Sequence, residues 1–203
     1  MRDARCDGGS WGSFDTALRE GVAGNEGILG LHLPLPEITP IINRAGVWHV
    51  DGAGAPIDET DLSSAQAVRA VVEGRFLSMR ARGGAIGLQG ARRILATGGG
   101  SQSAELLQVC ADVFNAQVLA DDTPDAAALG AAKRAAHAHA LAADHDGSPA
   151  SLPYEIFLRE RADSAAKELE VMATPRADDA AVYDEALVAK YKFFEDRVAA
   201  GEL

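Results

Sequence analysis

Cysteine is scarce in this chain, and long apolar runs are missing. The two cysteines, Cys6 and Cys110, lie far apart in the sequence, so a disulfide framework is not indicated. No stretch approaches the ~18 consecutive apolar residues that a membrane-spanning helix needs. The first twelve residues, MRDARCDGGSWG, contain no apolar signal-peptide core. We therefore expect a soluble, cytoplasmic protein with reduced cysteines and no membrane partner.

Basic residues are outnumbered by acidic ones. The chain has 19 Lys and Arg against 30 Asp and Glu, which gives a formal net charge of −11. Nucleic acid is therefore not an expected partner, and neither is an anionic membrane surface, because both need basic patches. One local basic cluster consists of Arg75, Arg80, Arg82, Arg92 and Arg93. We interpret these arginines as complements of a helix dipole, with a patch beside a bound phosphate as the alternative.

The common motifs of catalytic and metal sites are also missing. His137 and His139 lie about 200° apart on a helix and cannot share an ion, and the i, i+4 histidine spacing of zinc sites is absent. We expect both histidines on an exposed helix surface. No Gly-x-Ser-x-Gly elbow or Cys–His arrangement indicates a nucleophile, and nothing marks two carboxylates as a pair. The sequence therefore predicts no catalytic residue and no metal ligand.

The 203 residues suffice for one domain, and their patterns divide it into three parts. Residues 1–62 are expected to be irregular apart from one short helix, because prolines at 34, 36 and 40 oppose a central strand. Residues 63–145 show the alternating helices and strands of an α/β core. Residues 146–203 are expected to form surface helices that complete the same domain.

Two helices of the expected core carry informative patterns. The first runs from Ser63 or Ser64 to Arg82 and repeats apolar residues on one face. That face consists of Val68, Val71, Val72, Phe76 and Met79. The second, alanine-rich helix at 126–143 contains Gly130, which costs a helix ~1 kcal/mol relative to alanine. This glycine indicates close packing against a backbone or ligand, with alanine-rich packing as the alternative.

Three consecutive glycines stand in the segment RRILATGGGSQS, residues 92–103. The residues before them have the length and composition of a buried strand. After them, apolar side chains recur with the period of a helix at Leu106, Val109, Cys110 and Val113. Ser101 or Ser103 can cap this helix. The sequence therefore predicts a strand, a glycine turn and a helix, with the turn at Thr97–Ser103 lining an open cleft.

The glycine turn has three interpretations. Such a turn presents backbone N–H groups and lets another group come close, as nucleotide phosphates and ribose do. A tight β–α connection without a ligand is the plainer alternative. A dinucleotide site is the third, because Asp121 or Asp122 follows the near-match GGGSQS at about the required spacing of ~20 residues. Ser103 in place of the third glycine counts against that reading.

Residues 94–138 read ILATGGGSQSAELLQVCADVFNAQVLADDTPDAAALGAAKRAAHA. Four blocks follow one another in this region: the strand with TGGG, the helix with Gln108, ADVFNAQV and ALGAAKRA. In this order they resemble the adenosine-binding part of the FGGY carbohydrate kinases, and among them the xylulokinases. Similar blocks lie outside this region: GNEGILGLHLPLPEITP (24–40), AVRAVVEGRFLSMR (67–80) and YDEALVAKY (183–191). The resemblance spans nearly the whole chain, and its order of blocks is specific.

The resemblance implies an α/β fold, namely a partial actin-like ATPase (ribonuclease H-like) domain with additional C-terminal helices. It also implies ATP and Mg²⁺ as cofactors, ATP and ADP as ligands, and a pentulose as the sugar of the complete enzyme. Gly98, Gly99 and Gly100 would pass the backbone along the ribose and α-phosphate. Ser103 stands near the adenine, where the family uses a polar residue, often Asn. Glu37 and Thr39 would shape a loop beside the nucleotide.

The resemblance also implies groups that have no match here. The family uses an aspartate general base and a glycine–threonine hairpin for the terminal phosphates, both before the region matched, and the 203 residues contain no Gly-Thr-Ser hairpin. We therefore expect a chain that starts within the second domain. It is either a truncated gene product or a half that needs a partner, which would be a missing N-terminal half or a second copy of the chain.

Three hypotheses follow from these patterns. The first is the nucleotide-binding C-terminal part of a kinase that converts D-xylulose and ATP to D-xylulose 5-phosphate and ADP, inactive as an isolated chain. The second is a non-catalytic nucleotide-binding or interaction module. The third is a Rossmann-type protein that binds NAD.

Overall fold

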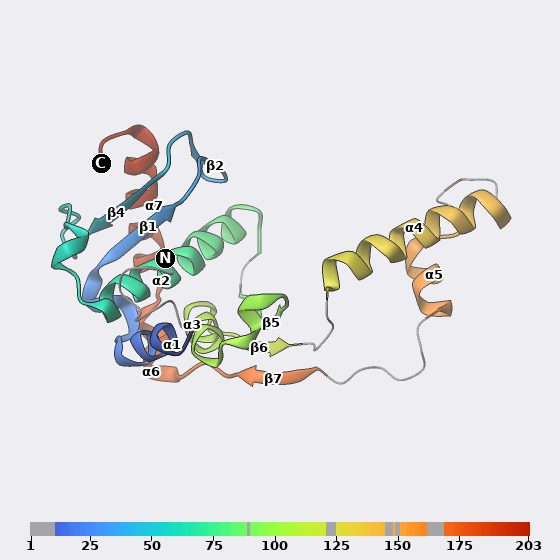
Figure 1. Ribbon diagram of the computed structural model, residues 1–203, viewed down its shortest axis with the longest axis horizontal. Coiled ribbons are helices and arrows are strands. Elements are labelled where there is room, and N and C mark those ends of the chain that lie inside the picture. The colour runs from blue at the N-terminus through green and yellow to red at the C-terminus, as the bar shows by residue number, and fades with distance from the viewer. Residues whose placement is uncertain (1–10, 89, 121–124, 145–147, 149–150, 162–168) are drawn as a thin grey trace.

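The computed structural model describes residues 11–88, 90–120, 125–144, 148, 151–161 and 169–203. Helices and strands alternate in an α/β arrangement. Figure 1 shows a main body that holds most of these elements and an arm formed by α4 and α5. None of the helices in the described ranges combines the length and the apolar character needed to cross a membrane.

The elements have the following bounds. The α-helices are α1 (Trp11–Glu20), α2 (Ser64–Ala85), α3 (Ala104–Phe114), α4 (Ala126–Asp144), α5 (Tyr154–Glu160), α6 (Ala177–Val182) and α7 (Glu185–Ala200). Short 3-10 helices are η2 (Ala23–Gly27), η3 (Glu59–Asp61) and η4 (Gly99–Gln102). The strands are β1 (Leu29–Leu33), β2 (Glu37–Ile38), β3 (Ile41–Ile42), β4 (Gly46–Val50), β5 (Arg93–Ala96), β6 (Gln117–Ala120) and β7 (Glu170–Ala173).

Helix α2 runs through the main body, where it contacts β1, α1, α3 and α7 (Figure 1). A capping box sets its start: the Gln66 N–H donates to Ser63 Oγ at 3.2 Å, and the Ser63 N–H donates to Gln66 Oε1 at 3.0 Å. Val68 and Val72 are buried as predicted. Met79 was also expected on the buried face, and that prediction is wrong, because Met79 is 53% exposed.

The prediction of an irregular N-terminal part is wrong for residues 11–62. β1 and β4 form an antiparallel pair, and β2 and β3 form a second one. β1 ends at Leu33, directly before Pro34, so the proline limits the strand without preventing it. Leu29, Leu31 and Leu33 are buried because β1 packs on α2. The short helix expected here is α1, with Leu18 buried.

The backbones of β1 and α2 meet closely at two glycines. A Cβ on Gly74 would lie 2.1 Å from the carbonyl oxygen of Gly30, a distance that no real side chain tolerates. Tyr191 of α7 donates its hydroxyl to the same oxygen at 3.3 Å. Gly74 therefore permits the contact that joins the N-terminal hairpin, the central helix and the C-terminal helix in one core.

β5, β6 and β7 form a second sheet in that order, with β5 parallel and β7 antiparallel to β6. α3 connects the parallel strands and packs on the sheet through Leu107 and Cys110, which meet Val118. The residues of β5 were expected to be buried, and this is wrong for Leu95, which is 52% exposed. In the part of the chain that is described, β5 lies at the edge of the sheet, and only β6 pairs with it.

The C-terminal part is more than a set of surface helices. α7 is helical as predicted, but Tyr191, Phe194 and Val198 are buried in the main core, so its placement on the surface is wrong. The chain also adds the strand β7, which the sequence patterns did not predict. α2 and β1 cover the apolar face of α7, and that contact depends on residues far apart in sequence.

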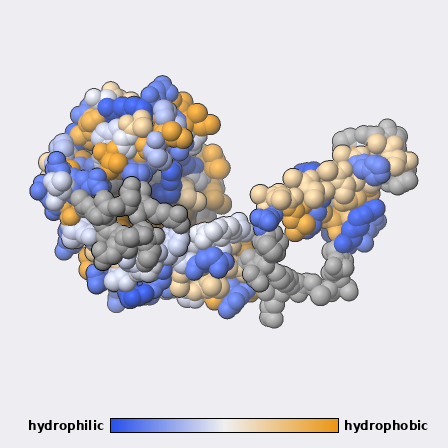
Figure 2. Space-filling model, viewed as in Figure 1, coloured by the Kyte–Doolittle hydropathy of each residue, from blue (hydrophilic) through white to orange (hydrophobic). Residues whose placement is uncertain are grey.

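The arm corrects two further predictions. A Cβ on Gly130 would meet no atom within 4 Å, so the close packing expected around this residue is not present. His137 was expected to be exposed, but it is buried, with Nε2 2.7 Å from the carbonyl oxygen of Leu152 and its ring 5.1 Å from that of Phe157. α5 folds back onto α4 and covers this histidine, whereas His139 is exposed as expected. Figure 2 shows α4 as a mainly hydrophobic surface.

Candidate functional site

The glycine turn joins the end of β5 to the start of α3. Gly98 has φ 80° and ψ −168°, a conformation that residues with a side chain rarely adopt. The next residues form η4, and α3 begins at Ala104. The prediction of a strand, a glycine turn and a helix is therefore confirmed.

The backbone of the turn is open to solvent. Thr97, Gly98, Gly99 and Gly100 are exposed. A Cβ on Gly98 or Gly99 would meet no atom within 4 Å, whereas a Cβ on Gly100 would lie 3.3 Å from Leu106 Cδ2. This open backbone fits the close approach of a ribose or a phosphate, because no side chain stands over it. The turn was expected to line an open cleft, but it contributes no residue to either of the two cavities at the ends of α3, so this expectation is not confirmed.

Ser103, one of the two candidates predicted for this position, is the N-cap of α3. Its Oγ accepts the Leu106 N–H at 3.1 Å and donates to Asp15 Oδ1 at 2.7 Å. Ser103 is also buried. The hydroxyl proton is thus already used, which leaves only acceptor capacity toward a ligand such as adenine. The role of Ser103 near the adenine stays a prediction.

Two residues of α1 contact the first turn of α3 and its cap. Asp15 accepts from Ser103, and Arg19 forms an ion pair with Glu105. The hydrogen bond from Arg19 lowers the pKa of the Glu105 carboxyl, which keeps a negative charge at the positive end of the helix dipole. No local sequence pattern indicates Asp15, because 88 residues separate it from Ser103.

Glu37 and Thr39 lie elsewhere in the molecule. Glu37 belongs to β2 and faces Arg75 of α2, with 3.9 Å between Oε1 and Nη2. Thr39 is exposed and precedes a cis peptide bond to Pro40. Figure 1 shows β2 well separated from the β5–α3 region. Within this chain the structure therefore does not bring the two residues to the glycine turn, and their role beside the nucleotide stays a prediction.

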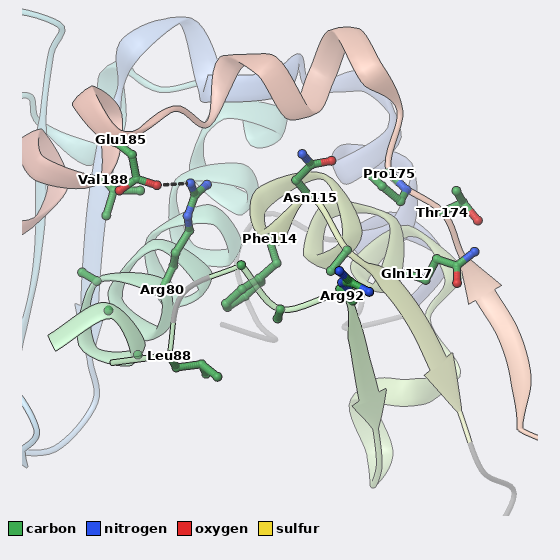
Figure 3. A pocket seen from close by; sticks show the side chains of 16 residues that line it. Arg80, Leu88, Arg92, Phe114, Asn115, Gln117, Thr174, Pro175, Glu185 and Val188 are labelled. Atoms are coloured by element: carbon green, nitrogen blue, oxygen red, sulfur yellow. Dashed lines mark hydrogen bonds and ion pairs between the residues drawn. The ribbon is translucent and has the colours of Figure 1, made fainter. Parts of the chain in front are cut away.

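A cavity of about 880 Å³ lies at the other end of the β5–β6 strand pair (Figure 3). Its wall includes Arg92, directly before β5, Gln117, the first residue of β6, and Phe114 at the end of α3. Arg80 also lines it and forms an ion pair with Glu185 at 2.6 Å. The amino ends of β5 and β6 border this cavity, whereas ligands of open α/β sheets typically bind beyond the carboxyl ends of the strands. No sequence pattern predicted this cavity.

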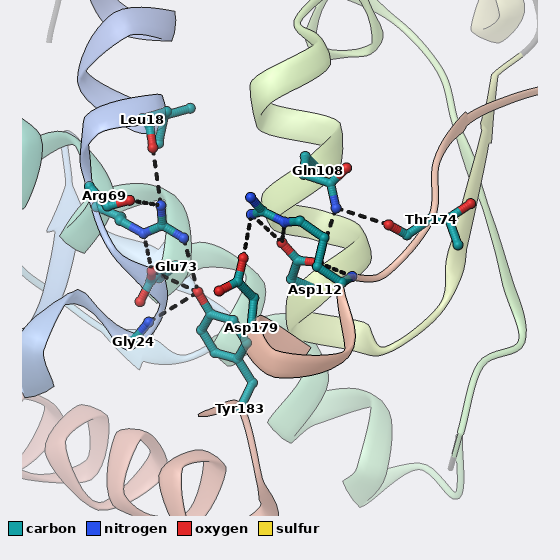
Figure 4. A network of polar contacts seen from close by, with 11 residues as sticks. Leu18, Gly24, Arg69, Glu73, Gln108, Asp112, Thr174, Asp179 and Tyr183 are labelled. Carbon is teal, nitrogen blue, oxygen red and sulfur yellow. Dashed lines mark hydrogen bonds and ion pairs between the residues drawn. The ribbon is translucent and has the colours of Figure 1, made fainter. Parts of the chain in front are cut away.

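A smaller cavity of about 460 Å³ lies between α1, α3 and α6, next to the start of α3. Polar networks border it (Figure 4). Arg176 binds both oxygens of Asp112 with its backbone and side-chain N–H groups, at 2.7 to 3.1 Å, and pairs with Asp179 at 2.8 Å. Gln108 donates to Asp112 at 3.0 Å. These bonds fix α3 relative to the segment that leads into α6.

The second network of Figure 4 is buried in the main body. Arg69 donates to Glu73 at 2.6 Å, and Tyr183 donates to the same carboxylate at 2.8 Å. Burial raises the pKa of Glu73, and its bonds to Arg69 and Tyr183 oppose that rise. The network is structural, because both charged side chains are almost fully buried.

The described residues contain no group of three or more His, Cys, Asp or Glu side chains that could hold a metal ion. Mg²⁺ is usually held by one or two carboxylates together with substrate phosphates, so a site of that kind would need the bound nucleotide. Asp121 and Asp122, on which the dinucleotide alternative depends, lie outside the described residues.

Comparisons with known proteins agree on one family. Residues 42–139 match the C-terminal domain of the FGGY family of carbohydrate kinases. The chain is 33% identical over 191 residues to a xylulose kinase of Rattus norvegicus, and 36% identical over 148 residues to xylulose kinase 2 of Arabidopsis thaliana. These alignments cover 93% and 68% of this chain, but only 32% and 26% of those proteins. The chain thus spans about a third or less of the length of these relatives.

Solved structures show the same fold at lower identity. A ligand-bound xylulose kinase from Lactobacillus acidophilus superposes with a TM-score of 0.62 at 21% identity, over 98% of this chain and 37% of that one. A gluconate kinase from the same organism gives a TM-score of 0.59 at 21% identity, over 95% and 35%. The predicted fold, part of an actin-like ATPase domain, is confirmed. Residues 42–139 thus match the C-terminal domain of the FGGY family of carbohydrate kinases, and the chain is similar to xylulose kinases over 93% of its length.

Proposed function

We propose that this chain is the nucleotide-binding part of an ATP-dependent carbohydrate kinase of the xylulokinase type. The complete enzyme would transfer the terminal phosphoryl group of ATP to D-xylulose, which yields D-xylulose 5-phosphate and ADP. Relatives named xylulose kinase at 32 to 36% identity support this proposal, and their shared region includes the family's C-terminal domain. They leave the Rossmann alternative without support.

One observation carries the assignment of nucleotide binding to this chain. The turn at Gly98–Gly100 lies within the family match and presents bare backbone to solvent at the carboxyl end of β5. A β-carbon at Gly99 would point into open space, so a ligand can approach the backbone there to van der Waals distance. Ligands of open α/β sheets bind at this end of the strands.

In this proposal the chain binds and orients the nucleotide, and other groups complete the chemistry. ATP supplies the phosphoryl group when bound, and Mg²⁺ neutralises the phosphate charge that develops during transfer. The general base and the terminal-phosphate hairpin would come from a further segment or a partner chain, because the resemblance finds no match for them in these 203 residues. Mg²⁺ would be held mainly through the nucleotide phosphates and those groups.

Calorimetric titration of the purified chain tests the proposal. We expect saturable binding of ADP and ATP in the presence of Mg²⁺, and no binding of NAD under the same conditions. A preference for NAD would contradict the kinase assignment. Binding of ADP without any kinase activity in the complete enzyme would instead favour the alternative of a non-catalytic nucleotide-binding module.

A further inference from the structure

Helix α1 holds the start of α3 through two side chains. Asp15 Oδ1 accepts the hydroxyl proton of Ser103 at 2.7 Å, in a partly buried position. One turn further along α1, Arg19 pairs with Glu105 in the first turn of α3. Both contacts lie directly after the glycine turn in sequence, since Ser103 follows η4.

The C-terminal end of α1 is also fixed to the core. Arg69 of α2 donates to the carbonyl oxygens of Leu18 at 3.0 Å and Gly21 at 2.6 Å, which are the acceptors left free at the end of a helix. Arg69 is itself held by Glu73 and by the hydroxyl of Tyr183, as Figure 4 shows. α1 therefore connects a rigid, buried ion pair to the cap of α3.

We propose that Asp15 is a positioning residue for the glycine turn. This inference rests on the proposed function, because it assigns to Asp15 a role in presenting Gly98–Gly100 to the nucleotide. Asp15 acts through Ser103 and does not itself contact the ligand.

Asp15 can position the turn because the Ser103 hydroxyl makes two hydrogen bonds at once. Ser103 Oγ caps α3 by accepting the Leu106 N–H, and it can hold that orientation because Asp15 fixes its proton. The Ser103 N–H also donates to the Gly100 carbonyl at 3.4 Å, so Ser103 is bonded to the last glycine of the turn. Without Asp15, the hydroxyl can rotate, and the cap and the turn both lose their fixed geometry.

The test compares three variants of the full chain. Asp15→Ala removes the acceptor, and Asp15→Asn keeps an acceptor oxygen while removing the charge. Glu20→Ala is the matched control, because it deletes an exposed carboxylate from the same helix. Hydrogen exchange of peptides covering residues 98–107 is measured without ligand, and ADP affinity is measured by calorimetry.

We expect Asp15→Ala to raise amide exchange at 98–107 and to weaken ADP binding, each by about tenfold, the effect of losing one charge-assisted hydrogen bond. Asp15→Asn should keep most of the protection from exchange at 98–107 and most of the ADP affinity. Exchange in α2 and α7 should not change. Unchanged exchange at 98–107 in Asp15→Ala would overturn the proposal, and so would raised exchange with unchanged ADP affinity. If the wild-type chain binds no ADP, the proposed function fails, and the exchange data alone decide whether Asp15 positions the turn.

Discussion

At the scale of single residues, a substitution of Gly99 distinguishes an effect on nucleotide binding from an effect on folding better than a substitution of Gly98 or Gly100 does. Gly98 has a positive φ, and a side chain on Gly100 would press on Leu106, so substitutions at either position also disturb the fold. Gly99 has neither problem, because the space around its missing Cβ is empty. A loss of binding caused by a side chain at Gly99 can therefore be assigned to the ligand.

We predict that Gly99→Val weakens ADP binding at least tenfold while the free energy of unfolding changes by less than about 0.5 kcal/mol, as for other exposed sites. The branched side chain would occupy the space of the ribose and α-phosphate. Gly52→Val is the matched control, since a Cβ there also meets no atom within 4 Å. Calorimetry and urea unfolding of both variants measure the two effects. Wild-type affinity in Gly99→Val would mean that the glycines serve only the turn.

A second residue-scale prediction concerns Cys110, which lies on the buried face of α3. Burial raises the pKa of its thiol to about 11. At pH 8 the reactive thiolate is therefore rarer than in the unfolded chain, and access is blocked as well. We expect Cys110 to resist iodoacetamide at pH 8 and to react once urea unfolds the chain. Mass spectrometry of the Cys110 peptide checks this, and rapid labelling under native conditions would contradict it.

At the scale of the elements, the sequence predicted the local units and missed the contacts between distant ones. The helices α2 and α3, the strand β6 and the glycine turn follow from capping residues and from apolar periodicity. The burial of α7 depends on β1 and α2, and that of His137 on α5, which no local pattern encodes. At the candidate site, the glycine turn and the cap Ser103 were predicted as local structure, whereas the contact from Asp15 was not.

The junction of α1, α2 and the segment before α7 depends on one buried ion pair. Replacing Arg69 by Leu would leave the Glu73 carboxylate buried without its ion-pair partner, and we expect a loss of about 3–5 kcal/mol in the free energy of unfolding. Arg69→Leu combined with Glu73→Leu should recover much of that loss, because no charge then stays unpaired. Urea unfolding of the single and double variants measures this. Equal stability of Arg69→Leu and wild type would show that the pair contributes little.

At the scale of the whole molecule, the chain is predicted to bind nucleotide without turning over sugar. A general base typically contributes 10²- to 10⁴-fold to the rate, and the resemblance finds neither that base nor the terminal-phosphate hairpin in this sequence. A coupled assay of ADP release, with saturating ATP, Mg²⁺ and D-xylulose, should give the same rate with and without the sugar. Sugar-dependent turnover near one per second, which lies within the usual range of enzymes, would overturn this prediction.

The central claim is that the nucleotide binds at the turn between β5 and α3. Two-dimensional ¹H–¹⁵N NMR of the labelled chain, titrated with ADP and Mg²⁺, tests it most directly, because Gly98, Gly99 and Gly100 each give an amide signal. We predict saturable shifts of these signals and of Ser103 at ADP concentrations that leave the signals of the β1–β4 hairpin unchanged. Saturable shifts confined to other residues, for example those of the cavity at Arg80 and Phe114, would contradict the claim.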